Sequence, residues 1–180
     1  MGPITYSLCQ KPVIGLMMWA TTLCTFPPLI DDEPFFIKEK KPSISIPFEV
    51  PVEKNYSLKM NFIFPTTEAR LQDEFVGTRY NQYCQDNIKY NGIPELDRKG
   101  LGQPMTFKIV IQKKDGSIVF EETVESLCVT SHRRNIKTRT ITRIPLLEGE
   151  YLAKITSLDN QNNFKDVNTS IRLDAGRWLK

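Results

Sequence analysis

Residues 55–64 read Asn-Tyr-Ser-Leu-Lys-Met-Asn-Phe-Ile-Phe, and this stretch decides the fold class. Large apolar side chains stand at every second position from Tyr56 to Phe64. A period of two is that of a β-strand, whose successive side chains point to opposite faces. The stretch therefore predicts a strand with one buried face. Pro65 ends it, because proline has no N–H to donate to a ladder.

Further strands are predicted on both sides of this stretch. Lys114-Asp115-Gly116 joins two apolar runs, and Asp-Gly is a hairpin signal. Leu147-x-Gly149-x-Tyr151 is typical of a tyrosine corner, in which the hydroxyl bonds to upstream backbone. We expect a mainly β fold, an immunoglobulin-like antiparallel β-sandwich with one short helix inserted after the second strand. The predicted strands are 43–50, 55–64, 105–113, 117–124, 136–144, 149–158 and 168–173.

The inserted helix is predicted over residues 67–76. Thr66 or Thr67 can cap its start, and Leu71 and Phe75 lie four residues apart on one face. Gly77 suits the helix end. We expect the polar stretch 78–103 to continue this helix and then to form a long loop.

The first thirty residues have the layout of an export signal. Lys11 precedes an uncharged, mostly apolar run that ends at Ile30, and Asp31-Asp32-Glu33 follows. Cations before such a run and carboxylates after it orient a chain for export. The segment could act either as a cleaved signal or as a retained membrane anchor. Lipid modification of Cys24 is disfavoured, because a lipoprotein signal has a small residue before the cysteine and Leu23 stands there. We expect a signal or anchor over 1–30, an extended lead-in over 31–43 and the sandwich over 44–180.

The composition fits one globular domain. Hydrophobic residues make up 40% of the chain and charged residues 25%, which is too apolar for a disordered chain. The formal charge of +3 is too mild to indicate nucleic-acid binding. Cys84 and Cys128 lie in the predicted domain. In an oxidising compartment they are expected to form one disulfide, and two unpaired buried thiols are the alternative.

Taken together, these landmarks resemble a bacterial family of exported single-domain proteins, often lipoproteins, known only as a domain of unknown function. The resemblance covers residues 44–174 and implies a β-sandwich exported to the cell envelope, with no catalytic residues to transfer. The segments that carry it are 55–62, Glu68-Ala69-Arg70, Gly102-x-Pro104, 107–109, Asp115-Gly116-Ser117, 139–144, Leu147-x-Gly149-x-Tyr151 and Ser157-Leu158.

Catalytic and metal-binding motifs are sparse. His132 is the one histidine, and its position between Ser131 and Arg133 is typical of a solvated loop. Glu121, Glu122 and Glu125 could bind a cation, although a solvated face paired with basic residues explains them better. Cysteine spacing gives no zinc pattern, and the phosphate-loop and EF-hand orders are missing. We expect no cofactor and no metal.

Residues 133–143 carry the one predicted interaction surface. In a strand, the apolar and threonine side chains would share one face and the cations the other. This strip either protects a strand edge from aggregation or docks an acidic protein or anionic lipid. The candidate partner-binding residues are Arg133, Arg134, Lys137, Arg139 and Arg143.

The predicted function is that of an exported, non-catalytic binding protein of the bacterial envelope. It would sit in the periplasm or be anchored facing it through its N-terminus, and bind a protein partner but no nucleic acid. An immunity protein that neutralises a delivered toxin is the specific hypothesis. The alternative is a small-ligand carrier or hydrolase with a pocket between the sandwich and segment 67–104, whose tyrosines Tyr80, Tyr83 and Tyr90 could line it.

Overall fold

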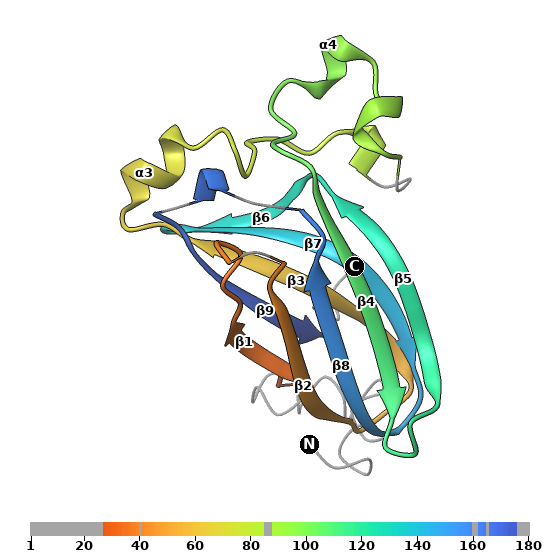
Figure 1. Ribbon diagram of the computed structural model, residues 1–180. Coiled ribbons are helices and arrows are strands. Elements are labelled where there is room, and N and C mark those ends of the chain that lie inside the picture. Colours follow the sequence, from red (N-terminus) through yellow and green to blue (C-terminus); the bar gives the residue numbers. More distant parts are fainter. Residues whose placement is uncertain (1–26, 40, 85–87, 160–161, 165, 176–180) are drawn as a thin grey trace, which may run out of the picture.

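The computed structural model describes residues 27–39, 41–84, 88–159, 162–164 and 166–175, and within them it contains two antiparallel sheets (Figure 1). The mainly β prediction is confirmed. No helix in the described part of the chain is long and apolar enough to cross a membrane. The strands are β1 Ile30–Pro34, β2 Ser43–Val50, β3 Lys54–Ile63, β4 Met105–Lys113, β5 Ile118–Ser126, β6 Val129–Arg133, β7 Ile136–Leu146, β8 Gly149–Ser157 and β9 Asn168–Asp174.

The strand order places β5 and β6 at neighbouring edges. One sheet has five strands in the order β1-β9-β3-β7-β6, and the other has four in the order β2-β8-β4-β5. Strands β5 and β6 therefore both end a sheet, and they are consecutive in the chain. In Figure 1 the chain passes from β5 to β6 at the upper end of the two sheets, below the segment that carries helix α4 (Glu95–Arg98).

The core lies between the two sheets and follows the predicted alternation. The side chains of Tyr56, Leu58, Met60 and Phe62 are buried on one face of β3. Alternate residues of β4 and β8 in the other sheet are buried opposite them, so each strand has one buried face. Seven predicted strands correspond to β2, β3, β4, β5, β7, β8 and β9, with bounds that differ by two residues at most.

Two tyrosine hydroxyls bond to the backbone four residues upstream. Tyr151 Oη donates to the carbonyl of Leu147 at 3.0 Å, which confirms the predicted tyrosine corner. Tyr56 Oη makes the same bond to the carbonyl of Val52, at 2.8 Å. Both tyrosines are buried, so these bonds satisfy hydroxyl groups that would be costly to leave without a partner.

The structure adds two edge strands that the hydropathy pattern does not reveal. Strand β1 pairs with β9, although it starts in the predicted leader and continues through the acidic boundary. Asp31 and Asp32 sit opposite Arg172, which forms ion pairs of 2.7 and 3.0 Å with them. Strand β6 pairs with β7 although residues 131–134 looked like a loop. Both strands have five residues of which four are exposed, so neither shows an alternating pattern.

The helical segment is shorter than predicted. Helix α3 covers Thr67–Gln72, and its N-cap is Thr66, whose hydroxyl accepts from the N–H of Ala69 at 3.1 Å. The helix stops early because the Asp73 carboxylate accepts from the backbone N–H groups of Phe75 and Val76. The predicted continuation is wrong: short 3₁₀ turns, η1 Gln82–Cys84 and η2 Tyr90–Gly92, and helix α4 Glu95–Arg98 follow instead.

Candidate binding cleft

A disulfide attaches the long insertion to the sandwich. We call residues 78–104, without 85–87, the cap. Cys84 of the cap is bonded to Cys128, which lies between β5 and β6, so the predicted pairing is confirmed. Ile93 and Leu101 of the cap pack against Leu127 and Cys128 of the sandwich in a small apolar cluster separate from the main core.

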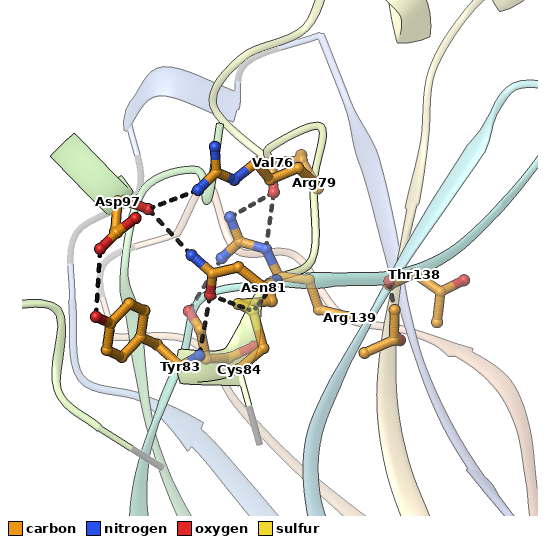
Figure 2. The surroundings of a disulfide bond; sticks show 11 residues. Val76, Arg79, Asn81, Tyr83, Cys84, Asp97, Thr138 and Arg139 are labelled. Carbon is orange, nitrogen blue, oxygen red and sulfur yellow. Dashed lines mark hydrogen bonds between the residues drawn. A yellow bond between two sulfur atoms is a disulfide. The ribbon is translucent and has the colours of Figure 1, made fainter. Parts of the chain in front are cut away.

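Polar contacts hold the cap together around Asp97 (Figure 2). Its backbone carbonyl accepts from Asn81 Nδ2 at 3.1 Å and from Arg79 at 3.3 Å. Its carboxylate accepts from Tyr83 Oη at 3.2 Å. The third candidate tyrosine, Tyr90, packs its ring under the Arg98 guanidinium at 5.0 Å. The cap is therefore a folded unit in spite of its glycines and prolines.

Two cations of the predicted strip are buried, and the prediction that they share an outward face is wrong. Lys137 is 4% exposed and Arg139 is 0% exposed. In β7 they point inward together with Ile141. A bulge in the pairing with β3 follows, after which the inward residues are Ile144 and Leu146. The physical reason lies in the 73–77 turn: its carboxylate and carbonyl groups are buried against this strand and need donors.

Arg139 joins the cap, the 73–77 turn and the end of β5 in one network. Its guanidinium donates to the carbonyl of Val76 at 2.7 Å, to that of Gln103 at 2.8 Å and to that of Ser126 at 3.0 Å. Figure 2 shows the guanidinium beside Val76 and close to the disulfide. Burial lowers the pKa of Arg139, and the charge of Asp73 acts in the opposite direction. The network replaces water around a buried cation.

Lys137 holds the 73–77 turn from the same face of β7. Its ammonium lies 2.7 Å from the Asp73 carboxylate and donates to the carbonyls of Asp73 and Gly77. Both partners of this ion pair are almost fully buried. The two inward cations of β7 therefore fix the start of the cap, and they are not available to a partner.

A cleft of about 940 Å³ lies between the cap and the β5/β7 side of the sandwich. This is where the carrier hypothesis expected a pocket, and Tyr80 and Tyr83 line it, whereas Tyr90 does not. The cap also contributes Ile88 and the disulfide. From the sandwich come Phe120, Glu121, Glu122 and Glu125 of β5, Leu127 and Thr130, and 140–143 of β7.

Three carboxylates from β5 line the cleft, and each takes part in an ion pair or a hydrogen bond. Glu121 forms an exposed ion pair with Lys108 at 2.8 Å. Glu122 is half-buried and accepts from the Thr142 hydroxyl at 3.1 Å, across the gap between the two sheets. Glu125 accepts from the first N–H of η2 at 2.5 Å. The wall is thus acidic, and Glu125 also helps to hold the cap.

The remaining candidate residues are exposed. Arg143 lines the cleft and forms no ion pair with any residue that the structure describes. Arg133 and Arg134 lie at the turn between β6 and β7, where Arg134 has a φ of 50°. His132 is exposed on β6, and its ring makes no hydrogen bond within the described ranges. These same ranges contain no group of three metal-ligating side chains.

The chain belongs to the family described as domain of unknown function DUF5625, whose model matches residues 32–175. The crystal structure of a protein from Sulfurospirillum deleyianum is similar, with a TM-score of 0.60 and 15% identity. The alignment covers 84% of this chain and 99% of that one, and at this identity it speaks for the fold alone. No curated protein matches.

Proposed function

We propose that this chain is a non-catalytic binding protein of the bacterial cell envelope and that the cleft under the cap is its binding site. The observation that carries the proposal is the cleft itself. Its volume of about 940 Å³ is in the range of protein ligand sites. Three aromatic rings line it beside three carboxylates, three threonines and Arg143, so the lining is more polar than that of most small-molecule pockets and suits a polar or charged ligand.

The way the cap is attached supports a preformed site. The disulfide and the Arg139 network fix the cap at two separate points. Ligand binding to such a site does not have to order a mobile loop, which lowers the entropic cost of association. The carboxylates of the cleft suit recognition of charge, whereas a histidine-based relay would need His132, which lies outside the cleft lining.

The disulfide also supports action outside the cytoplasm. Bonds of this kind form and persist in oxidising compartments such as the periplasm. Together with the charge layout of the leader, which lies mostly outside the described residues, it favours export to the envelope.

Site-specific photo-crosslinking in living cells tests the proposal. A photoreactive residue in place of Tyr80, which lines the cleft, should give discrete crosslinked products in the envelope fraction. The control is the same residue in place of Leu152, which is 38% exposed on β8. Equal crosslinking from both positions, or recovery of the protein in the cytoplasm, would contradict the proposal.

The immunity hypothesis keeps the class of envelope binding protein but uses a second surface, the turn that carries Arg133 and Arg134, which are exposed and lie outside the cleft lining. An acidic toxin surface would be held there by charge complementarity. Replacing both by glutamate should abolish protection of cells against the cognate toxin, while Lys99→Glu on the exposed cap should not. Full protection by the double variant would remove this turn from the interface.

A further inference from the structure

The cleft is bordered by a strand edge. Lining residues of β5 include the consecutive Phe120, Glu121 and Glu122, whose side chains point to alternate faces of the sheet. A cleft that touches both faces of a strand lies along its edge. Strand β5 ends the four-stranded sheet, and β4 is its one partner among the described strands.

This edge has the features of a pairing surface. Nine residues form β5, whereas the edge strands β1 and β6 have five each, and the eight residues of the edge strand β2 include Pro47, which has no N–H to donate. Ile118 is 55% exposed and Val119 is 43% exposed at its start. Long edge strands with exposed apolar residues are templates for another chain, because one row of N–H and C=O groups has no partner.

The side chains of the edge indicate the charge of an incoming strand. Glu121 and Glu125 lie on the outer face of β5, and Glu122 lies on the inner face. A strand added beside β5 would be about 4.8 Å away, with its side chains directly opposite those of β5. Three carboxylates against the single cation Arg143 leave this lining acidic, so lysine or arginine on such a strand would be attracted, in competition with Lys108 at Glu121 and Thr142 at Glu122. Acidic residues would be repelled by the carboxylates.

We propose that the cleft receives an extended, basic segment of a partner protein, which adds to β5 as a fifth strand of this sheet. The inference rests on the proposed function, because it names the ligand class of the same cleft. Main-chain hydrogen bonds to β5 supply affinity, and the carboxylates select a basic sequence. The cap and β7 form the other wall, and the added strand would displace the hydrogen bond that now joins Glu122 to Thr142 of β7.

Titration calorimetry with a synthetic peptide tests this inference on the oxidised protein. The probe is a capped peptide of about ten residues that alternates lysine with valine and threonine, the length of a typical strand. One control peptide has glutamate in place of lysine. A second control keeps the lysines but carries N-methyl groups on alternate backbone amides, which blocks strand pairing. We expect the lysine peptide to bind and both controls to bind about tenfold more weakly or not at all.

Paired variants of the protein locate the binding edge. Glu121→Lys with Thr123→Lys places two exposed cations on β5, and affinity for the lysine peptide should fall about tenfold. The control variant, Ser45→Lys with Glu49→Lys, places two exposed cations on β2, the opposite edge of the sheet. It should leave the affinity for the lysine peptide unchanged. Circular dichroism checks the fold of both variants. Amide hydrogen exchange should slow on β5 when the peptide binds, and not on β2.

Three outcomes overturn the inference. Failure of the lysine peptide to bind at millimolar concentration is one, and equal binding of the N-methylated peptide is another. Self-association of the chain through β5 is the third, since the occupant would then be a second copy. The proposed function stands apart from these results, because crosslinks from Tyr80 would still locate a ligand in the cleft.

Discussion

At the scale of single residues, Arg139 carries the most structural information. It is the largest fully buried side chain in the described chain, and it donates to carbonyl groups from three segments far apart in sequence. Its guanidinium carbon also lies 5.6 Å from the centre of the Phe62 ring, which belongs to the main core. Arg139 therefore contacts the core of the sandwich and the cap at the same time.

Replacing Arg139 by methionine should destabilise the protein by about 3–5 kcal/mol, because the carbonyls that it satisfies would stay buried without donors. Urea unfolding of the oxidised protein measures the change. The control is Arg143→Met, which alters an exposed arginine of the same strand and should change stability by less than about 0.5 kcal/mol. Equal effects of the two variants would contradict the importance of the buried network.

Gly102 offers a second test of the same network. Its φ is +84°, and an added Cβ would lie 2.5 Å from both the Arg139 guanidinium and the Val76 carbonyl. Gly116 has almost the same φ, +86°, with no atom within 4 Å. Both alanine variants bear the backbone strain of about 1 kcal/mol, so Gly102→Ala should lose at least about 1 kcal/mol more than Gly116→Ala. Thermal unfolding of the pair measures the difference, and equal losses would contradict the close approach.

At the scale of elements, the disulfide and the cap form the part of the fold that depends on redox conditions. Replacing Cys84 and Cys128 by serine removes a cross-link between residues 44 apart, worth about 4 kcal/mol in the chain-entropy model. Because the sheets have their own core, we expect the cap to become sensitive to proteases while far-ultraviolet circular dichroism stays unchanged. Mass spectrometry of the fragments should place the first cuts within 78–104. First cuts in the β-strands would contradict this independence.

The strands of this fold are predictable from sequence wherever one face is buried. Asn55 to Phe64 and the hairpin around Gly116 show their period or turn residues directly. Strands β1 and β6 are not predictable from their own residues, because four of the five residues in each are exposed. Pairing with β9 and β7 stabilises them instead. The inward direction of Lys137 and Arg139 is also hidden, since the carbonyls that attract them belong to distant residues. The alternation of β7 predicts two faces but not which one is buried.

The candidate site was predictable in position and not in composition. Three tyrosines in segment 67–104 indicated a pocket beside the sandwich, and two of them line the cleft. The contribution of β5 is missing from that prediction because Glu121, Glu122 and Glu125 look like an ordinary solvated face. Their place at the end of a sheet is a property of strand order, which no local pattern encodes.

At the scale of the whole molecule, the sandwich begins inside the predicted leader. Ile30 is 2% exposed in the core, and the N–H of Leu29 donates to the carbonyl of Leu173 at 2.8 Å. A membrane anchor that starts at Pro12 would then have about 17 residues, the lower limit for a spanning helix. On the proposed export, we expect the chain to be cut before Leu29, because Leu29 and Ile30 belong to the folded domain. Mass spectrometry of the envelope form would show this, and an intact N-terminus in the membrane fraction would contradict it.

The contact between Gly102 and Arg139 has an evolutionary consequence. A relative that replaces the arginine by a shorter side chain removes one of the two groups that a Cβ at position 102 would strike, the other being the Val76 carbonyl, and it also removes the donor for the carbonyls. Substitutions at the two positions, together with changes in the length of the 73–77 turn, should therefore occur as a set among homologues. A relative that keeps the arginine should keep the glycine.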